Sequence, residues 1–341
     1  MEKKFGKISR RTFLEGALAG GSLLVTSGIP VFAQSPTKLL FMEPFDLALE
    51  YIHEMNAVVG GHFEKEGLDV EINNARGTAV GIQQVIAGQA TVTRIGLLDL
   101  LKASGAQDTR LLSVATSLQG GIFSLVSRKA DPIMTPADLR GKTVGVASMG
   151  GGQENILNLL LASANIPVAD VPRQAIGSNA GNVEVLKAGR VDAFLATVET
   201  SLLLQTQGEP IEVWSTSKYA PLPGGVIVTT DKFAKDNHET VVKFVRAMRN
   251  SALEIIDSDP APILDRVVAK FDIVANESRD FRLKAIKAYN ELTLEQGREN
   301  VMRNVPSVFE GAAKLVNSAG IAKVDDVTSL YSNEFLDEAT K

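Results

Sequence analysis

Three consecutive glycines stand where a predicted strand gives way to a predicted helix. Gly150, Gly151 and Gly152 precede a helical apolar pattern over residues 153–164. Free backbone N–H groups and the positive end of a helix favour an anion or a carbonyl oxygen at such a turn. A flexible turn that only requires small residues is the alternative interpretation. The run is neither G-x-G-x-x-G nor a Walker motif, so it does not indicate a nucleotide site.

Charged side chains follow other predicted strands. Arg94 interrupts an apolar stretch at a strand end, and a guanidinium can hold a carboxylate or sulfonate through two parallel hydrogen bonds. A surface arginine that points away from the site is the alternative. Glu43 and Glu199 also follow strands, and carboxylates facing the same cleft would repel an anion. They would instead accept hydrogen bonds from an amine or aminopyrimidine, or one of them would pair with Arg94.

Residues suited to catalysis or metal binding are scarce. The chain has no cysteine, and its three histidines, His53, His62 and His238, do not follow a metal-ligand spacing. Neither a Gly-x-Ser-x-Gly elbow nor a His-Glu-x-x-His motif occurs. These residues therefore give no support for an enzyme, and they indicate no cofactor and no metal ion.

The composition excludes other classes of protein. The 341 residues are 45% hydrophobic, and 35 basic residues stand against 40 acidic ones, for a formal charge of −5. This balance excludes a strongly basic nucleic-acid binder, and the apolar content excludes general disorder. The length suffices for roughly two domains with their own cores.

Residues 1–33 are predicted to be a cleaved export signal. A basic start is followed by adjacent arginines within residues 9–14 (SRRTFL), which resemble the twin-arginine type of signal. A weakly apolar stretch then ends in Val31, Phe32 and Ala33, a small-residue cleavage site. A membrane anchor is the alternative. Because no lipid-carrying cysteine is present, we expect an unanchored protein in a bacterial periplasm.

Strand and helix patterns alternate along the rest of the chain. Short apolar or alternating runs predict strands at residues 39–42, 68–72, 90–93, 143–147, 175–177 and 193–197. Helical spacing predicts helices at residues 47–62, 79–87, 97–103, 153–164, 183–188, after residue 199, and at 241–256. Repeated strand–helix units of this length imply parallel sheets covered by helices on both faces.

Two similar segments divide this pattern. Residues 120–126 and 224–230 are both glycine pairs followed by apolar strands, and a complete set of strand–helix units lies between them. We therefore expect two lobes, with residues 34–126 plus 225–341 forming lobe 1 and residues 127–224 forming an inserted lobe 2. The two similar strands would be the crossovers and the hinge. A single larger sheet is the alternative.

Three strings of residues resemble those of a known family. They are GHFEKEGLDV at residues 61–70, DLRGKTVGV at 138–146 and GRVDA at 189–193. In this order they resemble periplasmic solute-binding proteins of ABC transporters, of the nitrate/sulfonate/taurine type, a pattern shared by binders of thiamin pyrimidine precursors. The strings themselves are interpreted as turns and caps of the scaffold. The resemblance implies an α/β, two-lobe periplasmic-binding-protein type II fold, with mainly parallel sheets, flanking helices and two crossover strands.

In such sheets, ligands bind outside the carboxyl ends of the strands. This rule predicts the following ligand-binding residues: Glu43, Phe45, Thr78, Arg94, Ser148, Gly150, Gly151, Gly152, Ser178, Asn179, Thr197 and Glu199.

The resemblance implies a monomeric receptor that delivers its ligand to the membrane permease and ATPase subunits of an ABC importer. We expect a small organic anion, a sulfonate or carboxylate, aromatic ones included. A pyrimidine-like heterocycle, or service to another transporter class, is the alternative.

Overall fold

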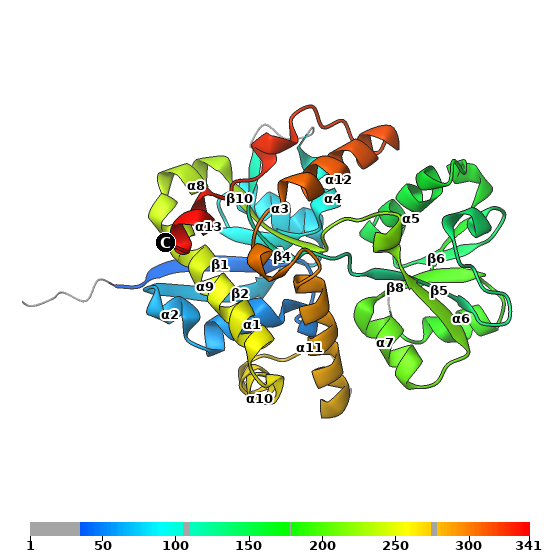
Figure 1. Ribbon diagram of the computed structural model, residues 1–341, viewed down its shortest axis with the longest axis horizontal. Coiled ribbons are helices and arrows are strands. Elements are labelled where there is room, and N and C mark those ends of the chain that lie inside the picture. The colour runs from blue at the N-terminus through cyan, green and yellow to red at the C-terminus, as the bar shows by residue number, and fades with distance from the viewer. Residues whose placement is uncertain (1–34, 105–109, 178, 274–277) are drawn as a thin grey trace, which may run out of the picture. The chain divides into compact units, whose positions relative to one another are not determined.

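Two five-stranded sheets organise the part of the chain that the computed structural model describes, residues 35–104, 110–177, 179–273 and 278–341 (Figure 1). The first sheet has the order β2-β1-β3-β10-β4, with strands β1 Thr37–Glu43, β2 Leu68–Asn74, β3 Val92–Ile95, β4 Leu111–Leu118 and β10 Gly225–Thr230. The second has the order β7-β6-β8-β5-β9, with strands β5 Phe123–Arg128, β6 Val144–Val146, β7 Arg173–Ala175, β8 Ala193–Thr197 and β9 Ile211–Ser215.

Both sheets are mixed, with parallel and antiparallel pairs of strands. Strand β1 runs parallel to β2 and β3, and β6 runs parallel to β7 and β8. Strand β10 runs antiparallel to β3 and β4, and β5 runs antiparallel to β8 and β9. The chain enters β5 and β10 from the other sheet, without the helical crossover that a parallel neighbour requires. The prediction of two α/β sheets is therefore confirmed, with more antiparallel pairing than expected.

The two segments that begin with glycine pairs occupy equivalent places. Each ends in a strand that lies inside its sheet between two antiparallel neighbours, β5 in the second sheet and β10 in the first. The connections that lead into them lie side by side (Figure 1), since the N–H of Gly224 donates to the carbonyl oxygen of Gly120 over 2.9 Å. Residues Pro36–Lys341 form one compact unit. Boundaries of an inserted lobe at residues 127 and 224 therefore stay a prediction.

Helices flank both sheets, and most of the predicted ones are present within a few residues. The pattern at residues 47–62 is divided into a 3₁₀ turn, Leu49–Tyr51, and two helices, because Gly61 takes the left-handed conformation at a φ of 70°. The helices are α1 Ile52–Val59, α2 His62–Lys65, α3 Thr78–Ile86, α4 Leu97–Ala103, α5 Gly152–Ser163, α6 Asn182–Lys187, α7 Val198–Thr206, α8 Asp231–Asp236, α9 His238–Asp257, α10 Pro260–Lys270, α11 Arg279–Thr293, α12 Pro306–Ser318 and α13 Glu334–Ala339. Across the described ranges, every helix is too short or too polar to cross a bilayer. The predicted export signal lies outside the described residues.

Two aspartates of the recognised strings hold turns, as the sequence predicts. The carboxylate of Asp138 accepts a hydrogen bond from the N–H of Thr135 over 2.9 Å and closes a capping box at a short 3₁₀ helix. The carboxylate of Asp192 accepts from the N–H of Thr143 over 2.9 Å and from Arg128 over 3.1 Å. These contacts fix the entry to the second sheet and leave both carboxylates engaged within the scaffold.

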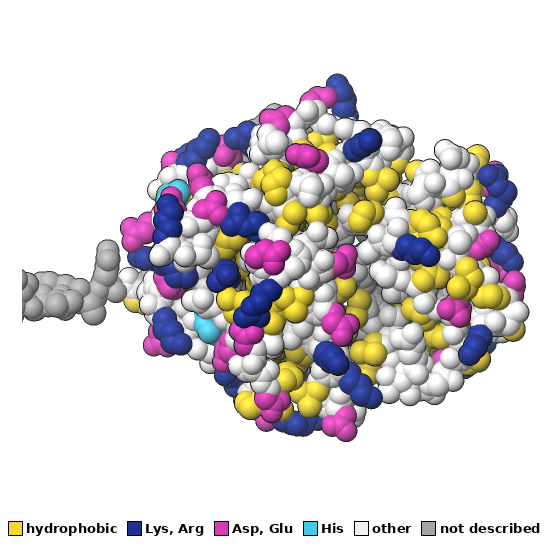
Figure 2. Space-filling view, viewed as in Figure 1, with side chains coloured by type: hydrophobic (Ala, Val, Ile, Leu, Met, Phe, Trp, Pro, Cys, Tyr) yellow, Lys and Arg dark blue, Asp and Glu magenta, His cyan; other side chains and the backbone are white. Residues whose placement is uncertain are grey.

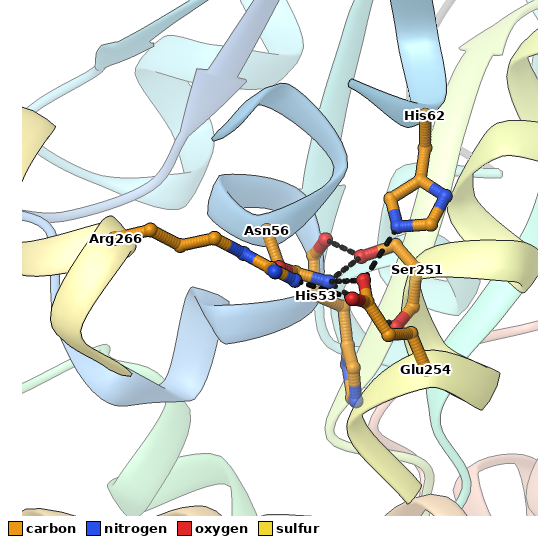
Figure 3. A network of polar contacts seen from close by, with 6 residues as sticks. All are labelled: His53, Asn56, His62, Ser251, Glu254 and Arg266. Carbon is orange, nitrogen blue, oxygen red and sulfur yellow. Dashed lines mark hydrogen bonds and ion pairs between the residues drawn. The ribbon is translucent and has the colours of Figure 1, made fainter. Parts of the chain in front are cut away.

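A polar network joins helices α1, α2, α9 and α10 (Figure 3). At its centre, the carboxylate of Glu254 lies 2.7 Å from Arg266, accepts from the amide of Asn56 over 3.0 Å, and lies 2.7 Å from the ring of His62. Partial burial pushes the pKa of Glu254 up, but these hydrogen bonds outweigh it and hold the pKa at about 2. The ionised carboxylate therefore stabilises the packing of these helices.

We predict that Glu254→Gln lowers the free energy of unfolding by about 1–2 kcal/mol at pH 7, because a partly exposed but multiply bonded carboxylate loses its charge. The contribution of Glu254 is present above the unfolded pKa near 4.5. It disappears as the pH falls towards about 2. Urea titrations at pH 7 and pH 3 would measure both effects. Glu239→Gln, on the exposed face of the same helix, is the matched control and should change little; equal losses for the two variants would contradict the prediction.

Candidate functional site

A cavity of about 1130 Å³ is lined by loops from both sheets. Its walls include the segments that follow β1, β2 and β3 of the first sheet and those that follow β6 and β8 of the second. The carboxyl ends of these strands converge on one space, as the binding rule for open α/β sheets requires. The cavity is therefore the candidate ligand site.

Ten of the twelve predicted site residues line this cavity, namely Phe45, Thr78, Arg94, Ser148, Gly150, Gly151, Gly152, Asn179, Thr197 and Glu199. Glu43 does not, because its side chain is fully buried behind the cavity wall. Ser178 lies outside the described residues. The position of a side chain on the wall does not show that it contacts a ligand, so ligand contact stays a prediction for each of these residues.

The glycine turn adopts a conformation that requires its first glycine. Gly150 has a φ of 73°, which favours glycine over any side-chain-bearing residue. The N–H of Gly150 donates to the carboxylate of Glu154 in the first turn of α5, and the N–H of Ala147 donates to Gln153 over 2.6 Å. Both hydrogen bonds use N–H groups that precede α5, and no side chain of the described residues caps its first turn. A ligand at this turn would meet the N–H groups of the first turn together with one acidic side chain.

Gly152 leaves room beside an aromatic ring. A Cβ atom at this position would lie 3.9 Å from the ring of Phe123 and would touch nothing closer. Both residues line the cavity. A larger side chain at position 152 would therefore occupy ligand space without displacing the fold.

The structure places Arg94 in a buried ionic cluster in the cavity wall. Its Nη2 lies 3.1 Å from the carboxylate of Glu50, and its Nε lies 3.9 Å from that of Glu54. The guanidinium also lies over the ring of Tyr51, 4.9 Å from the centroid. Only 1% of Arg94 is exposed. Carboxylates of the protein itself therefore compensate the charge of Arg94, and an anion that approached it would compete with these existing ion pairs.

The carboxyl groups of this cluster have perturbed acidity. Burial, reinforced by the neighbouring charge of Glu54, raises the pKa of Glu43 well above its usual range. Burial also raises the pKa of Glu50 and of Glu54, and the charge of Arg94 opposes both increases. Among the described residues, the carboxylate oxygens of Glu43 and Glu54 accept no side-chain or backbone hydrogen bond. Arg94 is therefore the cation that keeps Glu50 and Glu54 compatible with burial.

Sequence reasoning missed an exposed cation on the cavity wall. Arg76 lies two residues after the end of β2 and lines the cavity together with Gly77 and Thr78, yet the strand-end rule selected only Thr78 there. Its φ of 42° is unusual for a residue with a side chain, and such backbone conformations occur preferentially at functional sites. Within the described ranges Arg76 forms no ion pair. The sequence did contain a signal for Arg76 as a site residue, namely a basic residue close to the end of a predicted strand.

Lys102 and Asn155 were also missed. The ammonium group of Lys102 on α4 donates to the side-chain oxygen of Asn155 on α5 over 3.2 Å, and both residues line the cavity. This hydrogen bond joins a helix of the first sheet to a helix of the second. Because the two residues lie 53 positions apart, sequence spacing gave no signal for the contact.

The fold defined by these sheets is that of periplasmic binding proteins, and solved structures share it. A protein of Bordetella bronchiseptica RB50 is 21% identical, with a TM-score of 0.66 over 90% of this chain and 98% of that one. The alkanesulfonate-binding protein SsuA of Xanthomonas axonopodis pv. citri, bound to MOPS, is 15% identical, with a TM-score of 0.65 over 88% of this chain and 99% of that one. The desulfurization enzyme DSZB, with biphenyl-2-sulfinic acid, is 13% identical, with a TM-score of 0.60 over 89% and 99%.

The chain belongs to the NMT1/THI5 like family, whose model matches residues 51–261. The resemblance inferred from the three strings is thereby confirmed. No curated protein matches the chain.

We predict that Arg94→Met lowers the free energy of unfolding by about 3–5 kcal/mol at pH 8, because Glu50 and Glu54 lose their buried cation. The loss should become smaller as the pH falls, because the raised pKa values of Glu50 and Glu54 favour protonation, and a protonated carboxyl group needs no cation. Urea titration of the ligand-free protein would measure it. Arg76→Met removes the same charge from an exposed site and is the control. Similar stabilities of the two variants would contradict a structural role for Arg94.

Proposed function

We propose that the protein is the solute-binding receptor of an ABC importer and captures a small organic anion between two hinged lobes. The observation that carries this proposal is that strand ends of both sheets line one shared cavity. Membership of the NMT1/THI5 like family and the fold shared with SsuA support the receptor role.

Hinged closure is favoured by the way the two sheets are connected. The chain passes between them twice, at residues 119–122 and 216–224, and the two passages are hydrogen-bonded to each other. The N–H of Gly121 also donates to the hydroxyl of Ser217 over 3.0 Å. Lobe 1 (residues 34–126 plus 225–341) and lobe 2 (residues 127–224) would move about this paired connection. A ligand that contacts both lobes stabilises the closed form because it binds that form better.

The anionic group of the ligand would bind the exposed Arg76 and the N–H groups at the start of α5. Arg76 carries a charge that no carboxylate among the described residues compensates, and the first turn of α5 presents backbone donors. Arg94 is a weaker candidate since Glu50 and Glu54 already hold it. A pyrimidine-like heterocycle is the second candidate, because Glu50 lines the cavity and can accept hydrogen bonds from amino groups.

The leader and the partners complete the proposal. Residues 1–33 would direct export to the periplasm by the twin-arginine route, with cleavage near Ala33. The receptor would act as a monomer with permease and ATPase subunits. On the face drawn in Figure 2, Lys and Arg side chains are interspersed with Asp and Glu side chains. That face lacks the continuous basic stripe that a nucleic-acid partner would need.

We propose a binding role rather than catalysis, although the enzyme DSZB shares the fold. The chain has no cysteine to act as a nucleophile. All three histidines are within the described residues and none of them lines the cavity. The cavity therefore lacks cysteine as a nucleophile and histidine, the commonest general base.

A thermal-shift panel of sulfonates, carboxylates and aminopyrimidines tests the function. A ligand present at 100 times its Kd stabilises the folded state by about 2.7 kcal/mol, so at least one sulfonate or carboxylate should raise the melting temperature by several degrees. Chromatography of the recovered compound should show it unchanged. Conversion of the compound would contradict the receptor role, and a shift with aminopyrimidines alone would contradict the anion.

Gly152→Val tests whether the glycine turn forms part of the site. The valine side chain would enter the cavity beside Phe123, so we expect affinity for the stabilising compound to fall at least tenfold while the ligand-free melting temperature stays nearly unchanged. Gly311→Val, at an exposed position of α12 where a Cβ meets no atom within 4 Å, is the control. Unchanged affinity for Gly152→Val would remove the turn from the site.

A further inference from the structure

We infer that the ligand has a bulky apolar body, such as an aromatic ring system, and that Phe45 and Phe123 select for it. This inference rests on the proposed function and specifies its ligand class. It excludes inorganic anions and short alkyl sulfonates or carboxylates as the preferred ligands.

The size of the cavity is the first argument. A volume of about 1130 Å³ lies just above the range of about 300–1000 Å³ typical of small-molecule pockets. An inorganic anion or a two-carbon sulfonate would leave most of this space filled with water. A ligand with a large body makes contacts with both walls.

The chemistry of the walls is the second argument. The first-sheet side contributes Phe45, Ile82 and Leu98, and the second-sheet side contributes Phe123, Ile156 and Leu203. Water beside such side chains is released when an apolar ligand covers them, which favours binding by about 25 cal/mol for each Å² of apolar surface removed from water. A ligand that consists only of a charged group would leave these apolar side chains hydrated.

The two phenylalanines show most directly where the body would lie. Phe45 is 58% exposed, an unusual state for a large aromatic side chain, and it lies in the loop after β1 on the cavity wall. Phe123 begins β5 and lines the cavity beside the glycine turn. Exposed apolar side chains that gather at a concave surface mark binding sites. Because the two rings come from different sheets, a ligand held between them would also connect the two lobes.

The charges on the walls complete the argument. Arg94 is compensated by Glu50 and Glu54, and Lys102 is hydrogen-bonded to Asn155. Arg76 and Lys102 are therefore the exposed cations on the wall that have no ion pair among the described residues, and Lys102 is engaged by the neutral amide of Asn155. Two exposed cations beside two opposing apolar surfaces match a ligand with one acidic group and a bulky apolar remainder. They do not match a compact ion that needs several charged partners.

Three sulfonates with the same charged group test this inference: ethanesulfonate, benzenesulfonate and naphthalene-2-sulfonate. We expect the affinity measured by calorimetry to rise along the series, with naphthalene-2-sulfonate bound at least about 100-fold more tightly than ethanesulfonate. A carboxylate series of propionate, benzoate and 2-naphthoate repeats the comparison with another acidic group. Equal or tighter binding of the shortest members would overturn the inference and leave the receptor function intact. Failure of all six compounds to bind would overturn the organic-anion function and the inference with it.

Variants locate the apolar contacts. Phe45→Ala and Phe123→Ala should each weaken naphthalene-2-sulfonate binding about tenfold and ethanesulfonate binding less than twofold, since only the larger body reaches the rings. Met134→Ala removes another exposed apolar side chain that does not line the cavity and is the control. Phe45 is exposed, so its loss should not affect folding even if Phe123→Ala proves unstable. Unchanged affinity of Phe45→Ala for naphthalene-2-sulfonate would overturn its assigned role.

Discussion

The buried charge of Arg94 constrains the cavity wall more than any other single group. An isolated guanidinium with 1% exposure would cost several kcal/mol of desolvation, so Glu50 and Glu54 must stay beside it. These carboxylates belong to the 3₁₀ turn and helix that follow β1, whereas Arg94 is the next-to-last residue of β3. The cluster therefore ties together two strand ends that open onto the cavity, and it explains why an arginine in an apolar strand is compatible with the fold. The same contacts reduce its value for holding an anion, and this is why we propose Arg76 for that task.

Much of the scaffold could be predicted from local patterns. Strand β8 has the predicted bounds, and α3, α4 and α5 lie within a residue or two of their expected positions, because apolar spacing and glycine turns are local signals. Strand β4 was not predicted although all its residues are buried. Its polar residues Ser113 and Thr116 interrupt the apolar pattern and find their partner in Asn304, some 190 residues away. Such a partner cannot be identified from spacing.

Most of the predicted site residues line one cavity, whereas their contact with a ligand stays a prediction. The strand-end rule located most of the wall because it depends on topology alone. It could not distinguish Glu43, which lies behind the wall, from Phe45, which lies on it, since two positions of sequence separate them. It also could not show that Glu50 and Glu54, four residues apart, face Arg94. Fold and family follow from the sequence, whereas charge compensation inside the wall becomes visible only in three dimensions.

A crystal structure of the protein grown with naphthalene-2-sulfonate would test the account most directly. The account predicts density in the cavity with the ring system against Phe45 and Phe123, the sulfonate at Arg76 or the first turn of α5, and Arg94 still paired with Glu50. A sulfonate bound by Arg94 after its separation from Glu50, or a ligand bound outside the cavity, would contradict it.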